Sequence, residues 1–497
     1  MSTPDWVQDA IFYQIFPDRF ARSNRNPSKN LPFELWDSAP TVHGFKGGDL
    51  YGIADKLDYL QDLGVTALYL NPVFESASNH RYHTYDYYQV DPLLGGNAAL
   101  RELLDKAHER NMRVILDGVF NHASRGFWQF HHVLENGISS PYRDWFFFDT
   151  ARLRGQRRWG AYPTPEETEA LQKGEDSLKA IGYRGWWNLP ALPKFNTNTQ
   201  AVRTFLFEVA KYWIEFGADG WRLDVPGDID DDSFWQEFRY RVRQVNPQAY
   251  IVGEIWHEAQ RWLQGDQFDA VMNYELTKPV LAFTGGKHLN TRVAHQQSNY
   301  QGIQHTIDAH EFANQVDHNR GLYRSDITYS QLNLLDSHDT PRFLSCVNGD
   351  KDALRLAWLF LLTYPGAPCI YYGDEIGIDG QHDPDCRKSF PWDEHRWDQN
   401  LRSYVKEAIA LRKGNPVLRR GDFTRLWSAD GTYAFSRSLE GRTLVVALNA
   451  SETRQQLNVS FEAQETPQIL FGKASDISFG DGELRFSVPA RSGVILG

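Results

Sequence analysis

Short apolar runs alternate with longer amphipathic segments along the first part of the chain. Runs rich in β-branched and aromatic residues predict buried strands at 10–16, 67–74 and 113–120. Between them, apolar residues recur every three to four positions, which predicts helices at 54–64 and 98–111. Strands and helices that alternate at this spacing are typical of βαβ units and therefore of a parallel sheet.

The alternation stops after residue 122 and returns near residue 199. The intervening stretch is rich in aromatic residues, Gly and Pro. It is several times longer than an ordinary connection from a strand to a helix, so we expect a small inserted subdomain, domain B, at 123–196.

The second half of the chain repeats the alternation of strands and helices and ends in a segment with a different sequence pattern. Four more strands are predicted after the strand at 220–225, which brings the count to eight and favours a (β/α)₈ barrel. The predicted strands are 249–256, 269–274, 330–336 and 368–377, the helices are 199–216, 232–246, 258–265, 352–364 and 401–416, and 275–329 reads as irregular. From about residue 420, short alternating runs separated by polar turns predict an all-β domain.

We therefore predict an α/β protein with three parts. The barrel is built from 1–122 and 197–419, domain B at 123–196 follows its third strand, and a C-terminal β-sandwich occupies 420–497.

Composition narrows the range of partners. The formal charge of -12 and the pI of about 5.7 disfavour nucleic acid or an anionic membrane, which require a basic face. The chain contains Trp 16, Tyr 23 and Phe 30. We expect about two-thirds of these rings in cores, but such rings also stack on sugars, and a neutral substrate is compatible with the charge.

The cysteines and the N-terminal sequence indicate a cytoplasmic protein. There are 3 cysteines, without metal-ligand spacing, which argues against a disulfide framework and against a zinc site. The first residues lack a basic region, a long apolar run and a cleavage site, and we expect no membrane span.

Polar residues follow four of the predicted strands. Any one of them could be a solvated strand end or a helix cap. Because the carboxyl ends of barrel strands meet at one rim, their recurrence indicates a single cleft. They are Asp117, Asn121 and His122, then Arg222 and Asp224, then Glu254, then His338 and Asp339.

Glycosidic cleavage needs two carboxylates with opposite tasks, and Asp224 and Glu254 could supply them. Arg222 points to the same strand face as Asp224 and is expected to hold it ionised. Glu254 has no such partner nearby in sequence, and beside Trp256 we expect its pKa to be raised. His338 and Asp339 could bind sugar hydroxyls and stabilise positive charge. A metallohydrolase is the rival interpretation, but its usual histidine spacings are missing.

Four motifs in order resemble those of the α-amylase family, glycoside hydrolase family 13. They are DGVFNH at 117–122, GWRLDV at 220–225, EIW at 254–256 and LLDSHD at 334–339. The resemblance implies the barrel, domain B and C-terminal β domain, and an α-glucan substrate. It implies Asp224 as nucleophile, Glu254 as acid/base and Asp339 as third acid, and it places Arg222, His122 and His338 around subsite −1. Tyr82 resembles the tyrosine that stacks on that sugar, with a core aromatic as the alternative.

Two further segments are similar to the cyclomaltodextrinase, neopullulanase and maltogenic amylase subgroup. LPKFN at 192–196 is similar to its MPKLN signature, and in DPDCRK the resemblance implies sugar contacts by Asp383 and Arg387. Trp256 would flank the leaving group. Overall the chain is similar to the short cyanobacterial-type debranching enzymes of this subgroup.

The chain departs from the subgroup in two places. Members usually carry an N-terminal β domain that builds their dimer, whereas here the first strand begins by about Ile11, so a homodimer would need another surface. Pro226-Gly227-Asp228 stands where members usually have Ala-Asn-Glu, which puts the leaving-group preference in question.

The resemblance also suggests a structural calcium ion, although the chemistry itself requires no cofactor. Oxygen ligands suit calcium, and the candidates are Asn24, Asn26, Asn30, Gly47 and Asp49. Lys29 falls where relatives place a ligand. An ordinary turn rich in Asn and Pro is the alternative.

The expected function is a retaining hydrolase of α-glucosidic bonds in maltooligosaccharides, cyclodextrins, pullulan or branched α-glucans. The alternative within enzymes is α-1,6 debranching or transglycosylation. A non-catalytic carbohydrate-binding relative is disfavoured, because all three acids are present.

Overall fold

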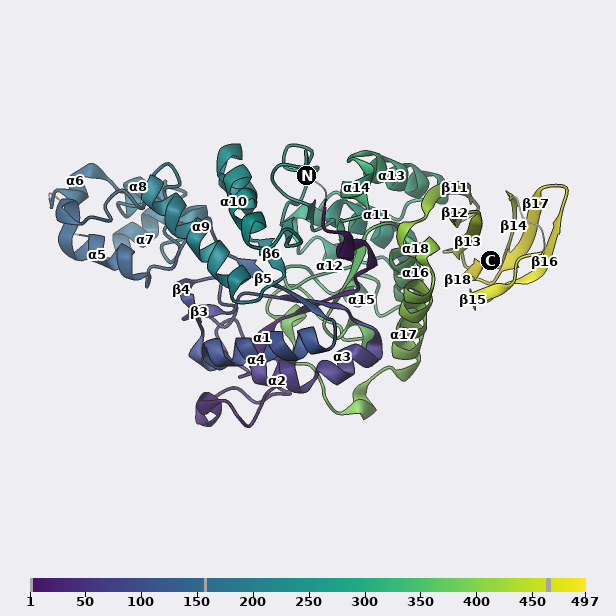
Figure 1. Ribbon diagram of the computed structural model, residues 1–497, viewed down its shortest axis with the longest axis horizontal. Helices are drawn as coiled ribbons and strands as arrows, with labels where there is room; N and C mark the ends of the chain where they lie inside the picture. Colours follow the sequence, from purple (N-terminus) through teal and green to yellow (C-terminus); the bar gives the residue numbers. More distant parts are fainter. Residues whose placement is uncertain (1–2, 156–158, 462–465) are drawn as a thin grey trace.

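The computed structural model describes residues 3–155, 159–461 and 466–497. Three short segments lie outside the described residues: 1–2 of the predicted barrel, 156–158 of the predicted domain B and 462–465 of the predicted C-terminal domain. Figure 1 shows three parts in a row, with domain B at one end, the barrel in the centre and the strands of the C-terminal domain at the other end.

Eight parallel strands form the barrel. Each predicted strand is present, in the order β8-β7-β6-β5-β2-β1-β10-β9. A single parallel bridge between Met272, next to β8, and Leu332 of β9 joins the two ends of this order and closes the ring. Nearly every strand residue is buried, because helices cover the outside and side chains fill the inside. The strands are β1 (Phe12–Ile15), β2 (Ala67–Leu70), β5 (Arg113–Gly118), β6 (Gly220–Leu223), β7 (Tyr250–Gly253), β8 (Ala270–Val271), β9 (Leu332–Leu334) and β10 (Ala367–Tyr371).

The covering helices are amphipathic. In α9, the sequence period predicts one face formed by Val202, Phe205, Val209 and Trp213. Val202, Val209 and Trp213 are buried together with Leu206, whereas Phe205 is half-buried and packs on the rings of Tyr87 and Phe127. The main helices here are α3 (Leu57–Leu63), α4 (Gly96–Glu109), α9 (Gln200–Glu215), α10 (Asp232–Val245), α16 (Lys351–Thr363) and α17 (Gln399–Gly414).

Two predictions of secondary structure are wrong. Residues 258–265 form successive turns instead of a helix, with bonds such as Trp262 N to Ala259 O spanning three residues. Eight residues gain too little from helical hydrogen bonds to offset nucleation, so tertiary packing decides. The stretch read as irregular contains α11 (Tyr274–Gly285) and α13 (Ala309–Gly321). Because α11 is buried on nearly all sides, it has no amphipathic period to detect.

Domain B is a small body around an aromatic core. Its two longer helices are α5 (Trp128–Asn136) and α7 (Pro165–Gln172), and Phe127, Phe146 and Phe195 pack against one another in its core. A bridge between His122 and Lys194 brings the start and end of the insertion together. The insertion therefore begins and ends at the rim of the barrel, beside β5.

The C-terminal domain is all β, as predicted. Buried residues of its two sheets form one core, with Val445 and Ala447 facing Leu457 and Phe486. One sheet contains β11 (Asp422–Ala429), β12 (Thr432–Leu439), β13 (Arg442–Asn449), β18 (Ser492–Leu496) and β15 (Ile469–Gly472), and the other β14 (Gln455–Ser460), β17 (Glu483–Val488) and β16 (Ser475–Gly480).

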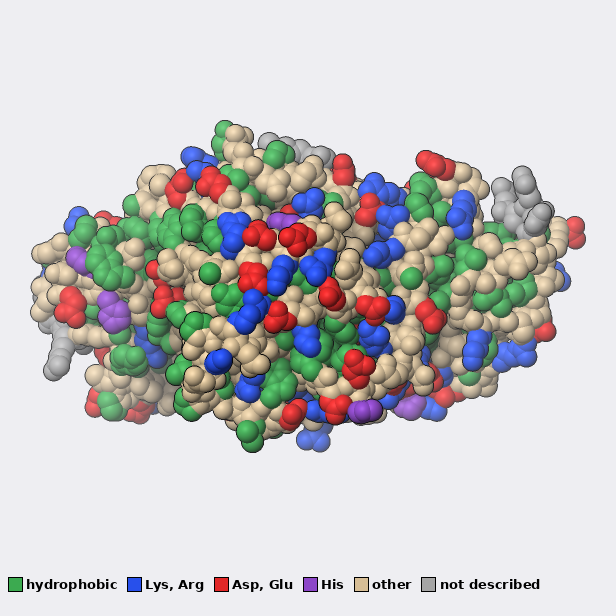
Figure 2. All heavy atoms as spheres, turned by 60° about the horizontal axis from the view of Figure 1, so that its bottom comes forward, with side chains coloured by type: hydrophobic (Ala, Val, Ile, Leu, Met, Phe, Trp, Pro, Cys, Tyr) green, Lys and Arg blue, Asp and Glu red, His purple; other side chains and the backbone are tan. Residues whose placement is uncertain are grey.

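The surface in Figure 2 mixes acidic and basic side chains rather than collecting one sign. Among the described residues, every helix is too short or too polar to cross a membrane.

A buried arginine joins the barrel to the C-terminal domain. Arg437 of β12 donates to the carbonyl oxygens of Leu418 (2.7 Å), Gly421 (2.8 Å) and Thr363, which ends α16. Burial lowers its pKa to about 10, so it remains charged at neutral pH. The guanidinium thus satisfies carbonyls of both domains at once.

We predict that Arg437→Met lowers the free energy of unfolding by about 2–4 kcal/mol, because it leaves the buried Thr363 carbonyl without its donor and removes one of the donors to Leu418 and Gly421, which keep Arg412 and Tyr329. Thermal unfolding followed by circular dichroism measures the change. The control is Arg485→Met, at an exposed arginine paired with Glu483, which should stay within about 0.5 kcal/mol. Equal stability of the two variants would contradict this account of the joint.

Candidate active site

The predicted site residues converge at the carboxyl ends of the barrel strands. A cleft of about 720 Å³ opens there between the barrel and domain B. Eight of the ten predicted catalytic and substrate-binding residues line it, and Arg222 and His338 are fully buried beside them. The eight are Tyr82, His122, Asp224, Glu254, Trp256, Asp339, Asp383 and Arg387.

Arg222, on β6, is the centre of the site. Its Nη1 lies 2.9 Å from Asp117 Oδ1 and 3.2 Å from Asp224 Oδ1. Its Nη2 forms an ion pair of 3.0 Å with Glu254 Oε2 that lacks hydrogen-bond geometry. One guanidinium therefore contacts three carboxyls from β5, β6 and β7 and draws both proposed catalytic acids together.

This arrangement corrects the expected division of labour. We expected Arg222 to hold Asp224 alone ionised and Glu254 to have no charged partner. Instead Arg222 contacts both acids. Asp224 and Glu254 follow the neighbouring parallel strands β6 and β7, so both carboxyls end beside the Arg222 guanidinium. Arg222 alone cannot distinguish a nucleophile from an acid.

Charge balance determines the protonation of the pair. Burial raises the pKa of Glu254 to about 7, helped by Asp339 and opposed by Arg222. Burial also raises the pKa of Asp224, again against Arg222. Because the cationic partners are too few for all the buried carboxyls, we infer that this pair holds one proton near neutral pH.

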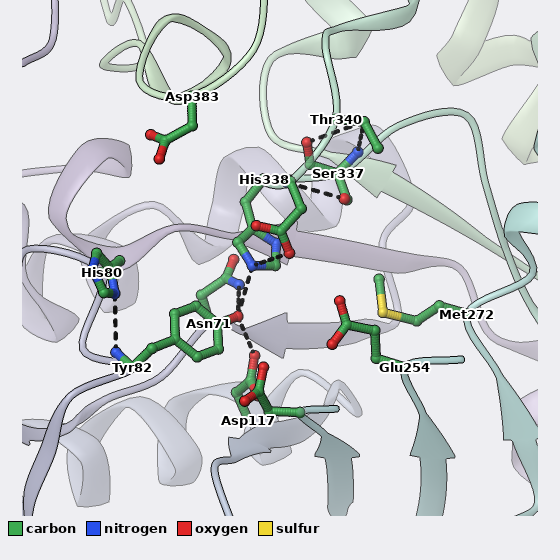
Figure 3. A network of polar contacts seen from close by, with 12 residues as sticks. Asn71, His80, Tyr82, Asp117, Glu254, Met272, Ser337, His338, Thr340 and Asp383 are labelled. Carbon is green, nitrogen blue, oxygen red and sulfur yellow. Dashed lines mark hydrogen bonds and ion pairs between the residues drawn. The ribbon is translucent and has the colours of Figure 1, made fainter. Parts of the chain in front are cut away.

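A second group of polar residues includes Asn71, Tyr82, Asp117 and His338, which lie next to one another in Figure 3. The Tyr82 hydroxyl donates to Asp117 Oδ2 at 2.9 Å and lies 2.6 Å from His338 Nε2, and the two rings stack. The Gln14 amide donates to His338 Nδ1 at 2.9 Å, so the neutral ring carries its proton on Nε2, which faces Asp339 Oδ2 at 2.9 Å. Burial lowers the pKa of His338 and keeps the ring neutral.

Asp339 remains ionised despite burial, because His338 and Arg387 lower its pKa. Arg387 Nη2 donates to Asp339 Oδ1 at 3.1 Å, and its Nη1 lies 3.0 Å from Asp383 Oδ1. The segment at 383–388 is thus tied directly to the third acid, and the predicted sugar contacts of Asp383 and Arg387 stay a prediction.

Trp256 contributes a polar contact as well as an apolar surface. Its ring stacks on Tyr274, with centroids 3.7 Å apart, and its Nε1 donates to Glu254 Oε1 at 3.2 Å. We expected Trp256 to raise the pKa of Glu254 through its apolar character. The donated hydrogen bond instead favours the carboxylate, and the raised pKa comes from burial and Asp339.

Several residues in the cleft or buried beside it were missed by sequence reasoning. Asn71, which follows β2 and donates to the Tyr82 hydroxyl at 3.1 Å, could have been found as a polar strand end. Gln297 lies in the stretch read as irregular and donates to the Asp339 carbonyl at 2.8 Å. Other cleft-lining residues that were missed include His80, His83, Trp186, Trp187 and Asn299, which lie on loops or in single 3-10 turns without a periodic signal.

The predicted calcium ligands lie together, but the described contacts do not fit an ion. Both carboxylate oxygens of Asp49 already accept hydrogen bonds, from Gly52 N at 2.7 Å and from Ser23 N at 3.1 Å. Asn26 Oδ1 accepts from a backbone amide, and Lys29 Nζ donates to the Asn24 carbonyl at 2.7 Å. Asn30 is exposed, and Gly47 lines the same hollow. The Lys29 ammonium group therefore already binds the Asn24 carbonyl oxygen, which a calcium ion would need as a ligand.

The site combines a coupled pair of carboxyls, a third ionised acid and a neutral imidazole in a cleft with aromatic walls. The pair of carboxyls is what cleavage of a glycosidic bond requires, and the third acid and the imidazole can stabilise the charge that develops on the sugar. Within the described ranges, His, Cys, Asp and Glu side chains form no group of three suited to a metal ion. The fold and site together define a barrel-type glycosidase.

Comparison with known proteins identifies the family. Residues 14–471 match the model of the α-amylase catalytic domain, and the chain belongs to the α-amylase family. It is 43% identical to neopullulanase 2 of Thermoactinomyces vulgaris, over 91% of this chain and 71% of the relative. It is 41% identical to a cyclomaltodextrinase of Geobacillus thermopakistaniensis, over 93% and 72%.

Solved structures show the same fold. A crystal structure of a debranching enzyme from Nostoc punctiforme superposes with a TM-score of 0.89 at 45% identity, covering 100% of this chain and 99% of the other. The expected family and fold are confirmed, and the protein is a glycoside hydrolase that acts on α-glucans.

We predict that activity falls as the pH rises through about 7, because the acid form of Glu254 is required. A profile of kcat/KM from about pH 4 to about pH 9 measures this fall in activity. Trp256→Phe removes a donor that favours the carboxylate, so its alkaline limb should move to higher pH. A limb that moves to lower pH in this variant would contradict the assignment.

We predict that chelation of divalent ions leaves the melting temperature of the wild type unchanged, because Lys29 already bonds the Asn24 carbonyl. Lys29→Asp replaces the ammonium with an oxygen ligand and should create a calcium-dependent rise in melting temperature. Differential scanning fluorimetry with and without calcium measures both. A fall for the wild type on chelation would show that an ion is bound.

Proposed function

We propose that the protein cleaves α-glucosidic bonds by double displacement, with retention at the anomeric carbon. Asp224 attacks that carbon, Glu254 protonates the departing oxygen, and Glu254 then activates the water that releases the sugar. The contact of one guanidinium with both carboxyls, at 3.2 Å and 3.0 Å, is the observation that carries the proposal. It holds the two acids as near neighbours, as a retaining mechanism requires.

The proton of the pair supports the assignment of roles. Glu254, with a pKa of about 7, can hold a proton at neutral pH and transfer it to the leaving oxygen. When that proton is in place on Glu254, Asp224 is the ionised partner beside Arg222 and acts as nucleophile. Val225 N donates to Glu254 Oε2 at 3.1 Å and helps to orient the acid.

Asp339 stabilises the positive charge that develops on the sugar ring. It remains ionised through His338 and Arg387, so it presents a full negative charge to the cleft. Tyr82, held by Asp117 and Asn71, provides the ring face against which a sugar can stack in subsite −1.

The substrates that we propose are maltooligosaccharides, cyclodextrins and pullulan, by similarity to the cyclomaltodextrinase and neopullulanase relatives. A second candidate is α-1,6 debranching. It is favoured by the match to the Nostoc debranching enzyme, which extends over essentially the full length of both chains, whereas the other two relatives are covered to 72% and 71%. Transglycosylation shares the same intermediate and stays open.

We also propose a cytoplasmic location, supported by the three cysteines, all free and buried. A homodimer, if one forms, can be recognised by light scattering of the purified protein.

We predict that β-cyclodextrin, pullulan and a 6-O-maltosyl branched maltooligosaccharide, incubated in parallel, all release small sugars. Chromatography of the products against time measures the order of preference. Asp224→Asn should lose at least about a thousandfold in kcat on each substrate, because the nucleophile is gone. Much faster release from the branched substrate would make debranching the main activity, and equal rates for the variant and the wild type would refute Asp224 as nucleophile.

A further inference from the structure

The loop that follows Asp224 is bonded to domain B through Asp228. Trp186 Nε1 donates to Asp228 Oδ2 at 2.6 Å, and Lys194 Nζ donates to the Asp228 carbonyl at 2.6 Å. Both donors come from domain B and both acceptors from one residue of the barrel loop. Asp228 therefore joins the two walls of the cleft.

Trp186 is the middle ring of a stack that rises from the site. It lies on His122, with centroids 4.9 Å apart and planes at 14°, and under Trp187, at 4.5 Å and 16°. Trp187 is 76% exposed, although it lines the cleft. An indole gains little stability from such exposure, so its placement needs another reason.

The backbone under the stack is strained. Trp187 and Asn188 have φ of 51° and 60°, in the left-handed region that residues with side chains rarely occupy, and Val225 on the opposite loop has φ of 36°. Strain of this kind persists where the surroundings impose it, and it collects at functional sites. The hydrogen bond from Trp186 to Asp228 joins the two strained segments.

The stack lies on the side of the acid. The same loop that carries Asp228 donates from Val225 N to Glu254 Oε2, and Gly227 lies between these two residues and lines the cleft. A Cβ added at Gly227 would meet only ordinary contacts, with Ile255 at 3.5 Å, so this part of the wall has room. Since Glu254 protonates the departing oxygen, the wall faces the leaving group.

We propose that Asp228 is a positioning residue for leaving-group recognition. It fixes Trp186 so that the exposed face of Trp187 stacks on the apolar face of a glucosyl unit beyond the bond that is cut. This inference rests on the proposed function, which assigns the acid to Glu254. Asp228 itself need not contact the substrate, and its effect passes through the tryptophan pair.

The test compares variants that break or keep one hydrogen bond. Asp228→Ala removes the acceptor and Trp186→Phe removes the donor, whereas Asp228→Asn keeps an acceptor oxygen. Asp230→Ala, two residues along and in an exposed ion pair with Arg261, is the matched control. Each is assayed on an aryl α-maltoside, whose leaving group is a single aromatic ring, and on a maltooligosaccharide with several glucosyl units in the leaving group.

We expect Asp228→Ala and Trp186→Phe to raise KM for the maltooligosaccharide by about three- to tenfold, the usual value of one aromatic stack. The ratio of kcat/KM between the two substrates should shift by the same factor, with the pH profile unmoved. Asp228→Asn and Asp230→Ala should keep the wild-type ratio. Adding Asp228→Ala to Trp187→Ala should change the ratio no further, because both remove the same contact.

An equal fall in kcat/KM on both substrates would show that Asp228 only maintains the fold, and an unchanged kcat/KM on both substrates would show that the stack does not bind sugar. Either result overturns the inference. Turnover of the aryl maltoside by the wild type tests the proposed chemistry separately, so failure of that chemistry is distinguishable from failure of this role.

Discussion

The structure of the site depends on one buried cation. Arg222 has no exposure to solvent and contacts Asp117, Asp224 and Glu254, each from a different strand. A guanidinium buried among carboxyls is costly unless it is paired, and removing one partner leaves an uncompensated charge. The same guanidinium keeps two like-charged acids close together, which their repulsion would otherwise oppose. The ion pairs of Arg222 therefore both hold the neighbouring strands together and position the acids for acid-base chemistry.

Around this centre, neutral groups orient the charged ones. Gln14 and Asn71 hold His338 and Tyr82, and these in turn face Asp339 and Asp117. Because His338 is neutral, it donates a hydrogen bond without adding a charge that would compete with Arg222. The three proposed catalytic acids consequently divide into the pair Asp224 and Glu254, which we infer to share one proton, and Asp339, whose pKa is lowered by His338 and Arg387, although all three lie on the same rim.

Much of the fold and of the site could be predicted from local patterns. Eight strands and most of the helices follow from apolar periodicity, and six of the ten predicted site residues follow from polar positions at strand ends, since both signals lie in neighbouring positions. The other four, Tyr82, Trp256, Asp383 and Arg387, were assigned as sugar contacts only through the family resemblance. The helices at Tyr274–Gly285 and Ala309–Gly321 were missed. The first of them is buried on nearly all sides, so burial there leaves no period in the sequence.

The sequence by itself determined the chemical groups and the strands that carry them, because residue type and alternation are local properties. Only the tertiary structure decided how those groups share charges. It gave Glu254 the same arginine as Asp224, turned the Trp256 indole into a hydrogen-bond donor, and brought Trp186 of domain B onto Asp228. These contacts join residues that are far apart in the chain or on different strands. These contacts form only when the barrel closes and domain B packs on it, so they cannot be predicted from the pattern of neighbouring residues.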